Sequence, residues 1–299
     1  MQLTLHHNTT YSFDRDVLLG PHDIRLRPAF HGRTPIVDYA LRVRPSDANL
    51  RWYVDAAGNR VARLLFPRAV SELALDITIT ADLVAYDPFD FLIDLWAAQF
   101  PFAYPADVAA ELAPALGAEV NSVEFAQWMA RLKNALLSAG SMNTVQLLVE
   151  VNKRVHADVA YTVREAIGVQ TPAQTLTMRS GSCRDSGWLL VQALRELGLA
   201  ARFVSGYLIQ PGAQATQQQS STGQTQTITQ PMRADFHAWA EVYLPGAGWI
   251  GLDPTSGLLT AEGHIPVAVA RHPAQAGPVV GSASPSEARL THHLEVTPA

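Results

Sequence analysis

The first part of the chain alternates short hydrophobic and polar runs in the manner of β-strands. Between Leu73 and Thr80, leucine or isoleucine at every second position alternates with small or polar residues, which is the period of a half-buried strand. Comparable runs cover residues 3–13, 24–28, 37–44, 50–54, 60–66 and 73–86, with turn residues between them and a hairpin candidate at 57–59. We therefore expect residues 1–94 to form a small antiparallel β-sandwich domain.

The pattern changes after residue 94. Prolines divide residues 95–143 into short helical pieces, a helical lead-in that includes an amphipathic helix over 123–137. Apolar residues then recur at helical spacing over 144–158, and a further helix is expected from Ser182 to Leu197, where Gly198 ends it. Strands follow at 202–209, 236–244 and 249–252. Helices followed by strands predict an α+β catalytic domain over residues 95–299.

An insert of low complexity lies between the first two of these later strands. Residues 211–230 are mostly Gln, Thr, Ser, Gly and Ala, a composition with too little apolar surface to order itself. We expect a flexible surface loop there. Because the loop leads into the strand that carries His237, it could act as a lid, and the alternative is a neutral insertion.

Composition narrows the functional classes. The chain has 299 residues and a net charge of −5, and its only lysines are Lys133 and Lys153, so it offers no basic face to nucleic acid. A single cysteine excludes internal disulfides and multi-cysteine metal clusters. The N-terminal residues do not resemble a signal peptide, and no run of ~18 apolar residues occurs. We therefore expect a cytoplasmic protein with no membrane partner, no metal and no cofactor.

The lone cysteine lies in an unusual setting. Ser182 is placed to begin the helix and Asp185 follows three residues later, which is the pattern of a capping box. Cys183 then becomes the first helical residue, where the helix dipole and free backbone amides favour a thiolate. Gly181 leaves room for a substrate to approach the sulfur. Most free cysteines are small buried hydrophobes, but this polar, glycine-flanked helix start favours a nucleophile.

A strand further along the chain offers a base. In the run 235–243, His237, Trp239 and Glu241 share one face, because side chains alternate along a strand. A histidine and a glutamate beside a tryptophan indicate a polar site. Glu241 is expected to pair with an arginine, either Arg184 or Arg202.

The next strand offers a carboxylate. Residues 245–248 predict a turn that folds residues 249–252 back onto the histidine strand. If Tyr243 pairs with Trp249, Asp253 falls opposite Trp239 and therefore on the face of His237. This register requires a loop with an odd number of residues, or else a bulge at Gly251. An aspartate at that position can hold the imidazole and stabilise its charged form.

Three blocks of the sequence, taken in order, resemble the transglutaminase-like superfamily, a papain-related group of thiol enzymes. They are Gly181-Ser182-Cys183-Arg184-Asp185, Phe236-His237-Ala238-Trp239-Ala240-Glu241 and Asp253-Pro254-Thr255. The first block, the helix over 188–194 and the run 168–172 with Tyr161 before it resemble the bacterial branch, whose members usually carry an N-terminal β-domain. The resemblance extends over nearly the whole chain. It implies a papain/transglutaminase-like catalytic core of helices and antiparallel sheet behind the β-sandwich.

By this resemblance Cys183 is the nucleophile, His237 the base and acid, and Asp253 the orienting carboxylate, with a thioester intermediate. The backbone N–H of Cys183 and the side chain of Tyr161 are candidate oxyanion donors. The alternative for Tyr161 is an ordinary half-buried aromatic. The residues expected to support the site are Ser182, Asp185, Trp239 and Glu241.

Two features of the animal transglutaminases are not recognisable. These enzymes use a tryptophan well upstream of the cysteine, whereas here the nearest upstream tryptophan is the distant Trp128, and calcium-loop carboxylate runs are not found. The sequence therefore predicts a thiol hydrolase that cleaves peptide or isopeptide amide bonds in a peptide or protein substrate. An amine-accepting acyltransferase and a catalytically inactive binding module are the alternatives.

Overall fold

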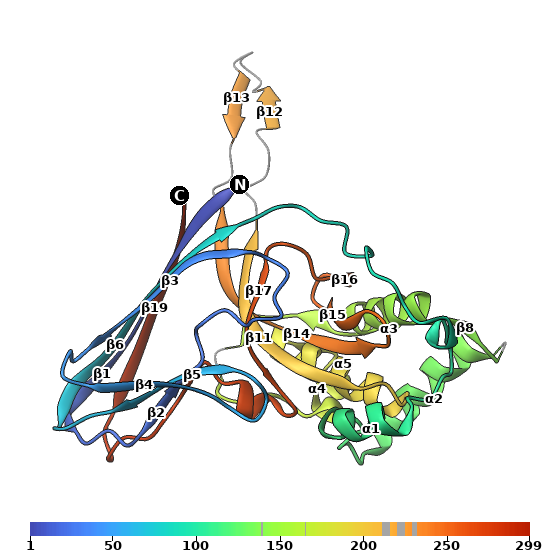
Figure 1. Cartoon of the computed structure of the whole chain (residues 1–299), viewed down its shortest axis with the longest axis horizontal. Coiled ribbons are helices and arrows are strands. Elements are labelled where there is room, and N and C mark those ends of the chain that lie inside the picture. Colours follow the sequence, from blue (N-terminus) through green and yellow to red (C-terminus); the bar gives the residue numbers. More distant parts are fainter. Residues whose placement is uncertain (139, 165, 211–215, 220–224, 229–231) are drawn as a thin grey trace.

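The computed structural model describes residues 1–138, 140–164, 166–210, 216–219, 225–228 and 232–299. Figure 1 shows three parts side by side, with the strands of the N-terminal region on one side, helices on the other and a sheet between them. The predicted α+β class, with an N-terminal antiparallel part, is confirmed. The central sheet has the strand order β16 (Leu258–Leu259), β15 (Gly248–Asp253), β14 (Arg233–Leu244), β11 (Ala201–Gln210) and β17 (His264–Ala270).

The N-terminal region is built from two four-stranded antiparallel sheets. One has the order β19 (Ala288–Pro298), β1 (Gln2–Val17), β6 (Val70–Asp82) and β3 (Ile36–Arg44). The other has the order β18 (Val279–Val280), β2 (His22–Ile24), β5 (Arg60–Leu65) and β4 (Asn49–Val54). Leu73, Leu75, Ile77 and Ile79 are all buried, so the alternation seen in the sequence marks the inner face of β6. The turn at 57–59 joins β4 to β5 as predicted, with Gly58 at a φ of +86°.

The end of the chain returns to this N-terminal region. β19 pairs with β1 along the run from Leu3 to Phe13, and β18 pairs with β2. The prediction assigned all residues from 95 to 299 to the second domain, so it did not anticipate that the last strand forms the edge of the first sheet. Figure 1 shows the two chain ends close together. The sequence pattern indicated this strand only weakly, because β19 is mostly exposed and lacks a clear hydrophobic alternation.

The helices lie together beside the central sheet (Figure 1). They are α1 (Ala106–Leu112), α2 (Val123–Leu137), α3 (Thr144–Asp158), α4 (Pro172–Met178) and α5 (Cys183–Glu196). The bounds of α2 and α3 agree with the ranges expected from the sequence. Three 3-10 turns add to them (Leu95–Ala97, Ala113–Ala115 and Pro273–Ala276), together with the short strand pairs β7 (Gln99–Phe100) with β8 (Met142–Asn143) and β9 (Ala160–Tyr161) with β10 (Ser180–Gly181).

Helix α5 is the centre of the second core. All eleven of its residues from Asp185 to Arg195 are buried, and the helix packs against β14, β11, α3 and α4. Gly187 lies at this contact, where a Cβ would meet the backbone of Trp239 at an ordinary van der Waals distance of 3.5 Å. Because α5 packs against these four elements, its first residue has a fixed position. The position of Cys183 is therefore set by the core.

The hairpin formed by β14 and β15 has the register predicted from the sequence. Tyr243 pairs with Trp249 and Ala240 with Leu252, with no bulge recorded between these two strands. Three residues, 245–247, connect the strands, so the loop has the odd length that the prediction required. This register brings Asp253, at the end of β15, beside the strand that carries His237.

The insert between β11 and β14 lies partly outside the described residues. The structure describes two short antiparallel strands within it, β12 (Thr216–Gln219) and β13 (Thr225–Ile228), which Figure 1 shows extending away from the body. The prediction of a loop without strands is corrected to this extent. Residues 211–215, 220–224 and 229–231 lie outside the described residues, and the flexibility and lid role of the insert stay predictions.

The N-terminal region and the central sheet share one hydrophobic core. Tyr207, Ile209, Ile265 and Val267 of the central sheet pack in the same cluster as the buried leucines of β1 and β6. His7 on β1 contributes a polar contact, because its Nδ1 lies 2.8 Å from the Tyr207 hydroxyl. Burial, with a smaller effect of His292, lowers the pKa of His7 to about 4. The two parts are therefore firmly joined. Within the described residues, no helix combines the length and apolar character needed to cross a membrane.

Candidate active site

Cys183 stands at the first position of α5, where the sequence predicted it. Its side chain is partly exposed, unlike most of the helix behind it. Backbone N–H groups in the first turn of a helix lack acceptors within the helix, and the helix dipole is positive there. Both effects place positive electrostatic potential at the sulfur. The sulfur thus combines access with an electropositive setting.

Asp185 organises the start of this helix. Its Oδ2 accepts hydrogen bonds of 2.8 Å from both the backbone N–H and the hydroxyl of Ser182, completing the capping box. Its Oδ1 accepts one of 2.7 Å from the backbone of Gln170, and Arg164 donates to both oxygens at 2.9 Å. Burial by itself raises the pKa of Asp185, but these donors outweigh it and lower the pKa. Asp185 thus holds Arg164 and Gln170 against the start of the helix.

His237 lies between the thiol and a carboxylate. Its Nε2 is 3.1 Å from Oδ2 of Asp253 and 3.3 Å from the Thr255 hydroxyl, and Cys183 lies close enough to the ring to raise its pKa. Because Nε2 faces the carboxylate, Nδ1 is the nitrogen left for the thiol. Burial by itself lowers the pKa of His237, but Asp253 and Cys183 raise it to about 9. The geometry therefore favours a charged imidazole at neutral pH.

Asp253 is buried and held from several directions. Its Oδ1 accepts hydrogen bonds from the backbone N–H and the hydroxyl of Thr255 at 2.9 and 2.7 Å, and its Oδ2 accepts one from Ser256 at 3.2 Å. Burial by itself raises the pKa of Asp253, but the hydrogen bonds from His237 and its other donors lower it strongly. Asp253 is therefore an ionised carboxylate that can orient the imidazole and balance its charge.

Tyr161 lies next to the chain segment that leads into the helix. It belongs to β9, which runs parallel to β10 and pairs Tyr161 with Gly181, two residues before Cys183. Its ring is 58% exposed, which differs from the half-buried packing considered as the alternative. Burial of the hydroxyl raises the pKa of Tyr161, and the charge of Cys183 raises it further. A protonated phenol near the sulfur could donate to an oxyanion, a role that stays a prediction.

Trp239 and Glu241 lie on the face of His237, as the alternation predicted. The Trp239 ring is fully buried and stacks on His237, with ring centres 6.2 Å apart. Of the two arginines expected to pair with Glu241, Arg202 is the partner, at 2.7 Å. Arg184 instead donates to the backbone carbonyl of Arg164 at 2.8 Å.

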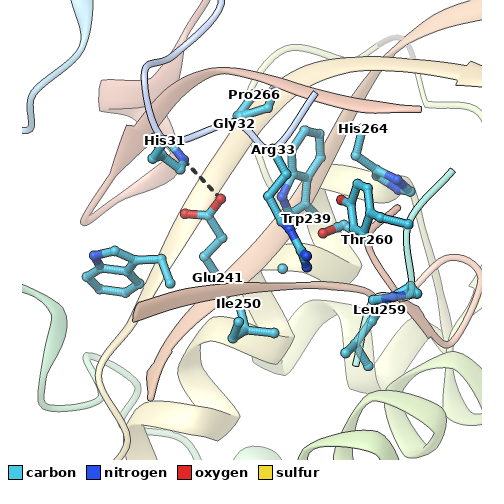
Figure 2. A pocket seen from close by; sticks show the side chains of 14 residues that line it. His31, Gly32, Arg33, Trp239, Glu241, Ile250, Leu259, Thr260, His264 and Pro266 are labelled. Carbon is cyan, nitrogen blue, oxygen red and sulfur yellow. Dashed lines mark hydrogen bonds and ion pairs between the residues drawn. The ribbon is translucent and has the colours of Figure 1, made fainter. Parts of the chain in front are cut away.

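Glu241 serves a buried ion-pair cluster and does not contact the three central residues. Figure 2 shows its side chain pointing at His31 of the N-terminal region, with a distance of 3.1 Å between Oε1 and Nε2. Burial by itself raises the pKa of Glu241, but Arg202 and His31 outweigh it and lower the pKa to about 2. The sequence predicted that Glu241 belongs to a polar site. In the structure its carboxylate joins the N-terminal region, through His31, to the central sheet, through Arg202.

A small pocket lies on this same face of the central sheet. Figure 2 shows His31, Gly32 and Arg33 of the N-terminal region on one side, facing Trp239 and His264. Trp239 stacks on His237, and His264 lies 3.4 Å from Asp253. The pocket is therefore separated from the candidate catalytic residues by single side chains.

Sequence reasoning missed several residues that hold the site. Arg164 and His264 lie outside the three blocks, and no spacing rule connected them to Asp185 or Asp253. Asn152 was missed as well, although a buried asparagine in the apolar stripe of α3 was a readable signal. Its side-chain amide donates to the backbone carbonyls of Asp253 and Leu258, at 3.3 and 3.0 Å, and so fixes the turn after β15.

The fold, with a thiol at the start of a helix next to a histidine and an aspartate, is typical of a class of thiol enzymes. Two family profiles match the chain: "Bacterial transglutaminase-like N-terminal region" over residues 3–82 and "Transglutaminase-like superfamily" over residues 132–254. The chain belongs to the transglutaminase-like superfamily, in agreement with the resemblance noted in the sequence.

Relatives extend this similarity over most of the chain. Uncharacterized proteins of Mycobacterium tuberculosis (Rv2569c) and Mycobacterium bovis (Mb2599c) are each 26% identical over 283 residues, covering 92% of this chain and 85% of theirs. Among solved structures, a "Putative Cysteine Protease from Cytophaga hutchinsonii" aligns with a TM-score of 0.68 and 19% identity. That alignment covers 99% of this chain and 90% of the other, so the fold is common to both.

Proposed function

We propose that the protein is a thiol-dependent hydrolase of peptide or isopeptide amide bonds. The observation that supports the proposal is the proximity of Cys183, His237 and Asp253: the imidazole lies 3.1 Å from the carboxylate and close enough to the thiol for Cys183 to raise its pKa. The substrate is a peptide or a protein, and no cofactor enters the reaction.

The chemistry follows from this order. The Cys183 thiolate attacks the amide carbonyl carbon and forms a carbon–sulfur bond, and the carbonyl electron pair moves to oxygen. The tetrahedral intermediate collapses when the His237 imidazolium gives its proton to the departing amine. The now neutral His237 takes a proton from water, which attacks the thioester. A carboxylic acid leaves, and the thiolate and the imidazolium are restored.

Two groups are proposed to stabilise the negative oxygen of the intermediates. The backbone N–H of Cys183 lies at the helix start, where it has no acceptor within the helix. Tyr161 supplies a phenol, and burial raises its pKa further above the ordinary value, so it remains protonated at neutral pH. Donors placed where negative charge develops typically contribute about a hundredfold or more to the rate.

The direct test is a library of peptides and isopeptides incubated with the wild type and with Cys183→Ala. Cleavage by the wild type with loss of about a thousandfold or more in the variant is expected. Mass spectrometry of the wild type quenched early should find the acyl group on Cys183. No cleavage of any library member, or equal cleavage by both proteins, contradicts the proposal.

An acyltransferase is the second candidate, because the matched superfamily is named after transglutaminases. It shares the thioester and differs in the acceptor. Adding a primary amine to the same reactions distinguishes the two, since a transferase converts the thioester to an amide product at the expense of acid. A third outcome, in which peptides bind but are never turned over by wild type or variant, would indicate a binding module.

We also propose that the protein works in the cytoplasm. A reducing compartment keeps a lone reactive thiol from forming mixed disulfides. Fractionation of the native host, with the protein followed by antibody, tests this assignment. Recovery outside the cytoplasmic fraction would contradict it.

A further inference from the structure

Two imidazoles meet at one carboxylate oxygen of Asp253. Nε2 of His237 lies 3.1 Å from Oδ2, and Nε2 of His264 lies 3.4 Å from the same atom. His264 begins β17, on the far side of β11 from the histidine strand, and it belongs to none of the three sequence blocks. The mechanism proposed above does not use it.

The hydrogen bonds around His264 fix where its proton lies. The backbone N–H of Ala261 donates to Nδ1 of His264 at 3.2 Å, so Nδ1 must be the unprotonated nitrogen. In a neutral ring the proton is then on Nε2, which faces Asp253. A doubly protonated ring would set two N–H groups against each other at Nδ1. Nε2 of His264 is therefore the nitrogen that donates toward the carboxylate.

The ring is also held in place by packing. Its side chain is only 11% exposed, and Trp239 meets it edge to face with ring centres 5.3 Å apart. The same Trp239 ring stacks on His237. One tryptophan therefore sets the planes of both imidazoles that reach Asp253.

His264 differs from the other donors to Asp253 in where it is anchored. Thr255 and Ser256 belong to the turn that directly follows Asp253, so they move with it. His264 reaches the carboxylate from another strand of the sheet. It ties the orientation of Asp253 to the rigid sheet as well as to its own turn.

The same three side chains could also suggest a metal. Ligand atoms of His237, Asp253 and His264 lie within 4.8 Å of one another. A metal needs an unprotonated imidazole nitrogen, but Ala261 occupies the unprotonated nitrogen of His264. The hydrogen-bond pattern thus favours a shared proton network over a metal ion.

We propose that His264 is a positioning residue, which donates a hydrogen bond to Asp253 and so holds the carboxylate in the orientation that His237 needs. The inference rests on the proposed function for its role in turnover, although its effect on the Cys183 thiol can be measured without any substrate. The other charged or titratable groups near His264, across the pocket, are His31, Arg33, Tyr86 and Glu241.

Two substitutions of His264 distinguish the effect of its hydrogen bond from the effect of its packing. His264→Phe keeps a planar ring but removes the hydrogen bond, whereas His264→Gln keeps an N–H donor near the position of Nε2. His31→Phe is the matched control, because it alters a histidine of the same pocket that bonds Glu241 and not Asp253. Thermal unfolding of all three shows whether each variant is folded.

The measurement is the rate at which iodoacetamide alkylates Cys183 as a function of pH. In His264→Phe we expect the midpoint to move to higher pH, because a loosened Asp253 stabilises the imidazolium, and with it the thiolate, less well. His264→Gln and His31→Phe should keep the wild-type midpoint. With a cleavable peptide, His264→Phe should lose about tenfold in kcat with little change in KM, and His264→Gln should recover most of it.

A wild-type midpoint in folded His264→Phe, or an altered midpoint in folded His264→Gln, overturns the inference. So does inhibition by micromolar Zn²⁺ that disappears in both variants, since that result would identify a metal site. If the wild-type thiol itself reacts like an ordinary cysteine, the proposed function fails. The two failures are thus distinguishable.

Discussion

Arg164 donates two hydrogen bonds of 2.9 Å to the two carboxylate oxygens of Asp185, a fully buried residue only two positions after Cys183. A paired geometry of this kind is among the strongest charge-assisted contacts in proteins. It locks the loop that contains Arg164 onto the first turn of α5. The surroundings of the thiol therefore depend on a buried ion pair whose arginine lies outside the three sequence blocks.

Replacement of Asp185 by asparagine should destabilise the protein strongly. Removing the carboxylate leaves the partly buried Arg164 without its partner, which typically costs about 3 kcal/mol or more. Asp47→Asn is a matched control, since the pair that Asp47 forms with Arg68 is exposed to solvent and its loss should change stability little. Urea denaturation at pH 7 measures both variants. Equal losses would contradict the anchoring role of Asp185.

The pH dependence of activity should follow the imidazole. Because the pKa of His237 is about 9, its charged form should persist to that pH, and the alkaline limb of kcat/KM should lie near it. In Asp253→Asn the charge that raises this pKa is gone, so the limb should move to lower pH and kcat should fall about a thousandfold or more. An unmoved alkaline limb in the variant would show that Asp253 does not control His237.

Glu241→Gln should affect stability and leave the thiol unchanged. The pKa of Glu241 is lowered from 4.5 to about 2, so its stabilising contribution is full above pH 4.5 and is lost as the pH falls through about 2. At pH 7 we expect the free energy of unfolding to fall by about 3 kcal/mol, because Arg202 loses its partner. Alkylation of Cys183 should match the wild type. Slower alkylation in a protein of unchanged stability would return Glu241 to the catalytic site.

His7 should make the protein sensitive to acid. The folded protein keeps this ring neutral down to about pH 4, whereas the unfolded chain protonates it near 6.5. Stability is thus full above pH 6.5 and declines as the pH falls toward 4, by up to about 3 kcal/mol from this residue. Urea denaturation of wild type and His7→Gln between pH 7 and 4.5 checks it. Parallel losses in both proteins would exclude His7 as the source.

Much of the fold could be read from local pattern. The helical stripe of 144–158 and the alternation around Leu73 are each produced by burial of one face, so periodicity reports them directly. The register of β14 and β15 followed from one pairing, Tyr243 with Trp249, because a one-residue slip would turn Asp253 to the opposite face. Strand β19 escaped because an exposed edge strand carries little hydrophobic pattern.

The residues of the candidate site likewise divide into those that the sequence predicted and those that it did not. Cys183, His237 and Asp253 lie in recognisable blocks because their surroundings demand particular residues, such as the glycine before the helix and the alternation along the strand. Arg164 and His264 reach the site from a loop and another strand, and their positions depend on tertiary packing. Residues that are far apart in the sequence and close in the fold leave no periodic pattern in a single sequence.

The pairing of β19 with β1 has a consequence for synthesis on the ribosome. On one side, β1 pairs with the eleven-residue strand β19 (Ala288–Pro298). Until residues 288–298 have been synthesised, β1 presents an open row of backbone donors and acceptors, which could pair with other nascent chains. The first sheet is thus completed only after residues 288–298 have left the exit tunnel.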